Sequence, residues 1–187
     1  DCWPTPGAGA SLAVPTWFYG HEPTNVFATG IAKYFANALR EDTLLHRCRG
    51  GIVFLPGQAE IRRVHQELSD KLAGRDDLLL CSLHGELDLN AQRAAIEPAP
   101  PGKRKIVLAT NIAETSLTIE GVRVVIDSGL ERAPKFDPVT GMTRLATQRI
   151  SQASAAQRAG RAGRLEPGVC YRLWSQTQHE QMAAYGA

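Results

Sequence analysis

Three arginines and a glutamine lie within eight residues, at Gln157, Arg158, Arg161 and Arg164. If this stretch is helical, at about 100° per residue, then Gln157, Arg161 and Arg164 point to one side and Arg158 lies on the flank. Arginines with small residues between them can present several planar guanidinium forks to a polyphosphate. The alternative is a solvated basic helix face, which is the commoner role of such a cluster. The stretch therefore predicts either a phosphate site or a basic surface.

The residues around this cluster favour a helix that begins after Ser154. Ser154 and Gln157 have the spacing of a capping box. Gly160 and Gly163 argue against the helix, because each costs about 1 kcal/mol relative to alanine in a helix interior. We therefore expect that Gly160 and Gly163 occur here for a reason other than helix stability.

A second group of polar side chains follows the apolar run at residues 105–109 and includes Thr110, Asn111, Thr115 and Ser116. Residues that follow a buried strand lie where a doubly wound sheet binds ligands. Hydroxyl groups there can donate hydrogen bonds to phosphate oxygens without carrying charge. The alternative is ordinary helix capping, since Asn111 and Glu114 have the spacing of an N-cap arrangement. The residues alone leave both interpretations open.

The apolar patterning that would position these groups alternates between strands and helices. Strands are expected at residues 16–19, 51–55, 78–82, 105–109, 122–127 and 168–174. Helices are expected at residues 29–40, along a stripe from Ile61 to Leu72, at residues 89–96 and over residues 176–187. This alternation predicts the α/β class, with a doubly wound and mostly parallel sheet, helices on both faces and ligands at the carboxyl ends of the strands.

The pattern changes between residues 131 and 150. Pro138 and Gly141 lie between two strand-like flanks, which predicts a β-hairpin over residues 135–144. From the residues alone, an ordinary surface hairpin is as good an explanation as a functional one.

Composition restricts the class of protein. The chain has 187 residues, 43% of them hydrophobic, which is enough to bury a core. Its net charge is only +2, so any site for a polyanion should be local. The four cysteines are scattered, without the spacing of a metal site, and we expect reduced thiols, no zinc and no disulfide. With no apolar run of about 20 residues and no leader pattern, a cytoplasmic protein without membrane contact is expected.

Several of these stretches resemble the motifs of superfamily 2 helicases. QRAGRAGR at residues 157–164 resembles motif VI, and TNIAETSLTI at residues 110–119 is similar to motif V of the DEAH-box group. FLPG at residues 54–57 resembles motif IV, LHGEL at residues 83–87 has the position of motif IVa, and EPAP at residues 97–100 is a further DEAH-box signature. The resemblance covers about residues 50–175, and motifs V and VI are its most specific parts. GKRK at residues 102–105, after EPAP, and FDPVTG at residues 136–141 look most like the bacterial HrpB type of ATP-dependent helicase.

The resemblance implies a RecA-like fold and a role for each motif. Arg161 and Arg164 would be arginine fingers, Gln157 would contact the γ-phosphate and the attacking water, and Glu120 and Ile96 would also contact the nucleotide. DEAH-box relatives often have an aromatic residue where this chain has Ile96, so the stacking contribution to base binding would be lost here. The hairpin would act in strand separation through Phe136, Thr140 and Arg144. Nucleic-acid contacts are implied for Pro56, Gly57, His84, Gly85, Thr110, Asn111, Thr115 and Ser116.

The sequence contains neither a G-x-x-x-x-G-K-[ST] loop nor an Asp-Glu-x-His motif. We therefore expect a second RecA-like domain only, inactive alone, whose ATP and Mg²⁺ are held largely by a first RecA-like domain outside this chain. Residues 1–15 are expected to form a linker, 16–175 the helicase C-terminal domain and 176–187 the start of a connection to C-terminal domains.

The expected function is that of an ATP-dependent RNA helicase acting on single-stranded RNA, or on DNA. The alternatives are a nucleic-acid-stimulated ATPase switch or remodelling scaffold that does not unwind duplexes, and an inactive binding module.

Overall fold

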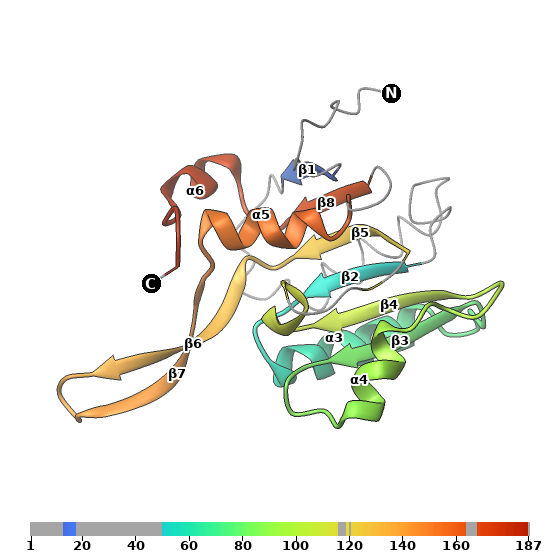
Figure 1. Cartoon of the computed structure of the whole chain (residues 1–187), viewed down its shortest axis with the longest axis horizontal. Helices are drawn as coiled ribbons and strands as arrows, with labels where there is room; N and C mark the ends of the chain where they lie inside the picture. Colours follow the sequence, from blue (N-terminus) through green and yellow to red (C-terminus); the bar gives the residue numbers. More distant parts are fainter. Residues whose placement is uncertain (1–12, 18–49, 116–118, 120, 164–167, 187) are drawn as a thin grey trace.

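The computed structural model describes residues 13–17, 50–115, 119, 121–163 and 168–186 of the chain (Figure 1). Its centre is a six-stranded sheet with the strand order β1-β8-β5-β2-β4-β3, in which all neighbouring strands pair in parallel. The sheet strands are β1 (Ala13–Trp17), β2 (Gly50–Phe54), β3 (Leu78–Leu83), β4 (Arg104–Ala109), β5 (Val122–Asp127) and β8 (Gly168–Arg172). This arrangement confirms the predicted parallel α/β fold.

Helices cover both faces of this sheet. One face is covered by α3 (Gln58–Lys71), whose stripe of Ile61, Val64 and Leu68 is buried against the sheet as predicted. The other face packs against Ala95 of α4 (Leu89–Ile96) and Ala159 of α5 (Gln152–Gly160). The small side chains on α5 allow that helix to lie close across β5 and β8 (Figure 1). No helix in the described ranges is long and apolar enough to cross a membrane.

Several predicted boundaries are wrong by a few residues, including the end of the last strand, which is Arg172 rather than residue 174. Strand β1 begins at Ala13, inside the segment expected to be a linker. Helix α5 begins at Gln152 rather than after Ser154, because the hydroxyl of Ser151 caps it by accepting a hydrogen bond from the Ser154 amide at 3.1 Å. Helix α6 (Gln176–Gln181) ends well before residue 187, because Met182 leaves the helical conformation. The helix expected at residues 29–40 lies outside the described residues.

The chain beyond α6 folds back onto the start of α5. Met182 is buried with Ile150 and Trp174 in a small apolar cluster. The amides of Gln152 and Ala153 donate to the carbonyl oxygens of Ala183 and Ala184 at 2.8 and 3.0 Å. These bonds satisfy N–H groups that the first turn of a helix otherwise leaves without a partner.

The predicted hairpin is present and is longer than expected. Strands β6 (Leu130–Asp137) and β7 (Met142–Arg149) pair along their whole length, from Leu130 opposite Arg149 to Asp137 opposite Met142. The hairpin forms its own two-stranded sheet and projects away from the central one (Figure 1). It is connected to the domain through residues 150–151, which lead into α5, and through the short junction between β5 and β6.

Gly129, in that junction, is expected to be intolerant of substitution. Its φ is +74°, and a Cβ atom there would lie 2.7 Å from Cε3 of the buried Trp174. Gly129→Ala should lower the free energy of unfolding by about 2–4 kcal/mol, because backbone strain and overpacking add. Gly141 is the matched control, since its φ is +67° but a Cβ there meets nothing within 4 Å. Urea unfolding should show a loss of about 1–2 kcal/mol for Gly141→Ala, and equal losses in the two variants would contradict the packing argument.

Candidate functional site

The residues that follow β2, β3 and β4 lie along the carboxyl edge of the sheet. The Leu55 amide donates to the Ala109 carbonyl at 2.8 Å, and the Thr110 amide donates to the Leu83 carbonyl at 3.1 Å. These bonds extend the sheet past the strand ends and hold the three following loops in register. The structure thus brings together six of the predicted nucleic-acid residues, which are Pro56, Gly57, His84, Gly85, Thr110 and Asn111.

These six residues differ in exposure. Gly85 and Asn111 are exposed, His84 and Thr110 are half-buried, and Pro56 and Gly57 are buried. The Nδ1 atom of His84 is buried, and among the described residues it has no hydrogen-bond partner. A polar atom in this state is a candidate for contact with a water molecule or a ligand.

Gly57 has a packing role that the sequence did not reveal. A Cβ atom there would lie 2.9 Å from Nε of Arg132, on the base of the hairpin, and 3.2 Å from Oε2 of Glu60. Arg132 also lies 3.6 Å from Oε1 of Glu60 and is nearly half exposed. Gly57 therefore lets the hairpin approach the carboxyl edge of the sheet and places a cation there.

The stretch after β4 forms a short 3-10 helix at Asn111–Ala113, and it does not form the N-cap arrangement considered from the sequence. Thr110 holds the cap position, without a side-chain hydrogen bond to the helix. The carboxylate of Glu114 instead accepts hydrogen bonds from Ser154 at 2.8 Å and from Arg158 at 2.9 Å. The capping alternative is therefore wrong, and Asn111 and Thr115 are left exposed to solvent.

The arginine cluster begins on α5 and continues beyond it. The helix ends at Gly160, so the cost of a glycine in a helix interior does not apply to Gly163. The helical path still extends through Arg161, whose φ is −65° and ψ is −32°. Gln157 is exposed and Arg161 is half-buried. Three predicted site residues, Ser116, Glu120 and Arg164, lie outside the described residues.

Arg161 reaches the carboxyl-edge loops through Glu114. The backbone next to Arg161 lies near the opposite end of the sheet, because a Cβ on Gly168 would meet the Ala162 carbonyl oxygen at 2.2 Å. Helical side chains lean toward the helix N-terminus, and Nε of Arg161 donates to the Glu114 carbonyl oxygen at 2.8 Å. Arg161 thus starts from a position away from the residues of the carboxyl edge, and the loop after β4 connects the two.

Arg158, to which the sequence assigned no role, has several partners in the site. It is completely buried and donates to Glu114 through Nε and to Asp127 through Nη1, each at 2.9 Å. Both Nη atoms lie 3.2 Å from the Leu130 carbonyl oxygen, and the guanidinium lies 4.9 Å from the ring centroid of Phe54. The sequence did contain a signal for this buried position. On a helix, Arg158 points to a different side from Gln157 and Arg161, and in the structure that side faces the sheet.

Burial and charge have opposite effects on the pKa values of Arg158 and Asp127. Burial raises the pKa of Asp127, and the nearby positive charge of Arg158 offsets this effect in part. Burial alone would lower the pKa of Arg158, but the charge of Asp127 and the hydrogen bonds to Glu114 and Asp127 raise it. Arg158 therefore stays a cation, and its two carboxylate partners are what make its burial tolerable.

The remaining predicted residues lie apart from this centre. Ile96 is half-buried and packs against the apolar cluster under α4 and α5. Phe136, Thr140 and Arg144 are exposed on the projecting hairpin, and Phe136 keeps 60% of its surface accessible. The hairpin residues therefore lie apart from the carboxyl edge, whereas Ile96 packs against the cluster that contains Ala159 and Ala162.

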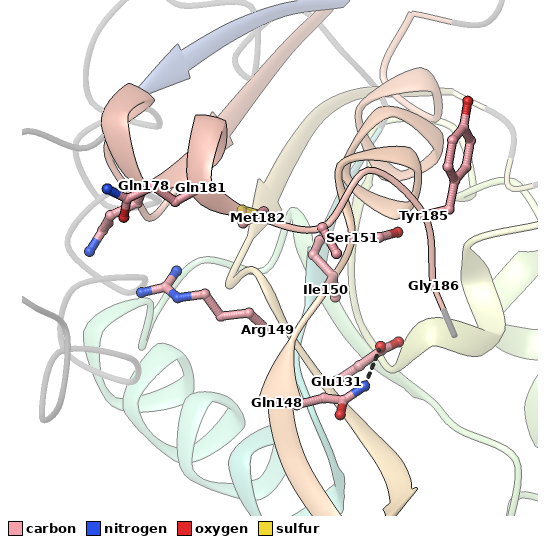
Figure 2. Close-up of a pocket in the computed structure, with 11 residues that line it drawn as sticks. Glu131, Gln148, Arg149, Ile150, Ser151, Gln178, Gln181, Met182, Tyr185 and Gly186 are labelled. Carbon is pink, nitrogen blue, oxygen red and sulfur yellow. Dashed lines mark hydrogen bonds between the residues drawn. The ribbon is translucent and has the colours of Figure 1, made fainter.

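A cavity of about 670 Å³ lies between the base of the hairpin and the segment after α6 (Figure 2). Glu131 and Gln148 from the two hairpin strands form a 3.1 Å hydrogen bond at its wall, and Arg149 and Tyr185 also line it. None of the predicted site residues lines this cavity.

Comparison with known proteins gives a consistent result. Residues 35–166 match the family model described as helicase conserved C-terminal domain. The chain is 60% identical over 133 residues to the ATP-dependent RNA helicase HrpB of Escherichia coli strain K12, a match covering 71% of this chain and 16% of that protein. It is 44% identical over 134 residues to the probable ATP-dependent RNA helicase DHX34 of Homo sapiens, covering 72% and 12%.

A crystal structure of the E. coli DExH-box NTPase HrpB superposes with a TM-score of 0.83 at 48% identity, covering 96% of this chain and 21% of that one. The chain thus spans only a small part of the length of these relatives.

Proposed function

The chain belongs to the helicase conserved C-terminal domain family, and we propose that, within a longer protein, it supplies arginines for ATP hydrolysis and holds single-stranded RNA. One observation carries this proposal, namely the hydrogen bond between Nε of Arg161 and the Glu114 carbonyl oxygen. It joins the arginine group to the loop whose exposed Asn111 and Thr115 suit contact with a nucleic-acid backbone.

At the nucleotide, Arg161 and Arg164 would stabilise the charge that develops on the phosphoryl group, and Gln157 would orient the attacking water. The anchored Nε atom supports this role for Arg161, because it fixes the plane of the guanidinium. The phosphate loop and the Mg²⁺ ligands would come from a first RecA-like domain outside this chain. The chain alone is therefore expected not to hydrolyse ATP. Glu120 and Ile96 would complete the nucleotide contacts.

At the nucleic acid, the residues along the carboxyl edge would contact phosphates and sugars. The hydroxyl of Ser116 would make a further contact of this kind next to that of Thr115. Such contacts do not distinguish one base from another, so RNA binding should be independent of the RNA sequence. The hairpin residues Phe136, Thr140 and Arg144 would act where the two strands of a duplex separate.

Thr115→Val is expected to weaken single-stranded RNA binding by the full-length protein about tenfold, because a hydrogen bond to a phosphate oxygen is lost while the side-chain shape is kept. The loss should be equal for RNAs of different sequence. Thr177→Val, on an exposed position of α6, is the control and should bind as the wild type does. Fluorescence anisotropy at fixed salt measures both variants, and equal affinities would contradict the assignment of Thr115.

Strand displacement tests the function as a whole. The full-length protein is expected to separate a tailed RNA duplex in the presence of ATP and to hydrolyse ATP faster when single-stranded RNA is added. A tailed DNA duplex in parallel compares the two kinds of nucleic acid. RNA-stimulated hydrolysis without displacement would favour a switch or remodelling scaffold, and an absence of hydrolysis would refute the proposal.

A further inference from the structure

We propose that Arg158 and Glu114 are positioning residues that couple the β6–β7 hairpin to Arg161. This inference rests on the proposed role of Arg161 at the nucleotide. It adds a path by which the position of the hairpin determines the position of the guanidinium of Arg161.

The first step of the path runs from Arg158 to Arg161 through one residue. The carboxylate of Glu114 is held by Arg158 at 2.9 Å and by Ser154 at 2.8 Å, so two side chains of α5 fix its position. The carbonyl oxygen of the same residue accepts the hydrogen bond from Nε of Arg161. A movement of Glu114 therefore moves the acceptor that orients the Arg161 guanidinium.

The second step runs from Arg158 to the hairpin. The Leu130 carbonyl oxygen, on the first residue of β6, lies 3.2 Å from both Nη1 and Nη2 of Arg158. Asp127, which binds Nη1, also accepts a hydrogen bond from the Gly129 amide at 2.8 Å. The junction between β5 and the hairpin is thus bonded to the same guanidinium at two places.

The buried environment makes this connection stiff. Arg158 and Asp127 are completely buried and the exposed fraction of the Glu114 side chain is only 14%, so water cannot readily replace a hydrogen bond that is broken. A displacement of Leu130 must then either break contacts of a buried cation or move Arg158 and Glu114 together. Arginine suits this position because its rigid planar fork serves several acceptors at once, whereas lysine is a point charge.

Glu114→Gln is the most direct test of this path. Glutamine keeps the side-chain size and the acceptor for Nε of Arg158, and its amide can donate to the Ser154 hydroxyl, but the negative charge is removed. The matched control is Asp77→Asn, because Asp77 also binds an arginine at 2.9 Å but does so near the amino end of β3, away from the site. Each substitution is made in the full-length protein and also combined with Phe136→Ala on the exposed face of the hairpin.

The expected result is a fall of about tenfold in RNA-stimulated kcat for Glu114→Gln, with KM for ATP close to that of Asp77→Asn. Tm should fall further for Glu114→Gln than for Asp77→Asn, because Glu114 is one of two carboxylates beside a buried cation, so kcat is compared at a temperature at which both variants are folded. Phe136→Ala should lower stimulated kcat in the Asp77→Asn background and have a smaller effect in the Glu114→Gln background, because the path is already weakened. Stimulated kcat for Glu114→Gln within about twofold of the control, or independent effects of the two substitutions, would overturn the inference. Full turnover by an Arg161→Ala enzyme would instead refute the proposed function.

Discussion

Arg161→Ala in the full-length protein is expected to reduce kcat for ATP hydrolysis by about 10³–10⁵-fold, the usual contribution of an arginine finger. The dissociation constant for ATP should change far less, because the guanidinium would act mainly on charge that develops in the transition state. The same result is expected for Arg164→Ala. Steady-state phosphate release and nucleotide titration measure the two quantities separately.

Two controls separate this catalytic role from a structural one. Arg63 lies exposed on α3, on the other face of the sheet, and Arg63→Ala should leave kcat unchanged. Arg161→Lys keeps the positive charge but loses the planar fork, so most of the activity should still be lost. The bond from Arg161 to Glu114 could also support the loop after β4, and a large fall in Tm would reveal this. An Arg161→Ala enzyme that keeps most of its turnover would remove Arg161 from the reaction.

The sequence predicted those parts of the fold that local patterns determine. Helix α4 runs from Leu89 to Ile96 as expected, because Asp88 caps it through its side chain and the chain after Ile96 is extended. The local pattern predicted Ser154 as the cap of α5, whereas the structure has Ser151 there. The Ser154 hydroxyl binds Glu114, 40 positions away in the chain, and the amides of the first turn bind the segment after α6.

In the candidate site, too, the sequence did not show contacts between residues that are far apart in the chain. The resemblance to motifs VI and V predicted roles for Arg161 and Thr115, but the sequence pattern could not show that Arg158 binds a backbone carbonyl at Leu130 or lies over Phe54. A backbone acceptor has no signature in the sequence, and the partners of a buried arginine depend on how the strands are ordered in the sheet. The sequence therefore placed Arg158 on the flank of the helix without showing that it binds three elements of the domain.

Arg158→Ala is expected to destabilise the domain by about 3–5 kcal/mol, the usual cost of removing one partner from a buried ion pair. The loss arises because Asp127 is completely buried, and Arg158 supplies its 2.9 Å ion pair. Arg75→Ala is the control, since the side chains of Arg75 and Asp77 are about one-third exposed and such pairs contribute at most about 1 kcal/mol. Amide hydrogen exchange of β2, β4 and β5 in the full-length protein would report the change for this domain.

The effect of pH shows whether the lost stability comes from the orphaned carboxylate. Burial already raises the pKa of Asp127, and removing Arg158 takes away the positive charge that opposes this increase. A carboxyl group whose pKa is higher in the folded than in the unfolded state stabilises the fold below its unfolded pKa, and this stabilisation is lost as pH rises through the folded pKa. The deficit of Arg158→Ala should therefore shrink as pH falls, and Arg158→Ala combined with Asp127→Asn should recover part of it at neutral pH. A deficit that is independent of pH and unchanged by Asp127→Asn would mean that the contact with Phe54 and lost packing, not the charge of Asp127, account for the stability that Arg158 provides.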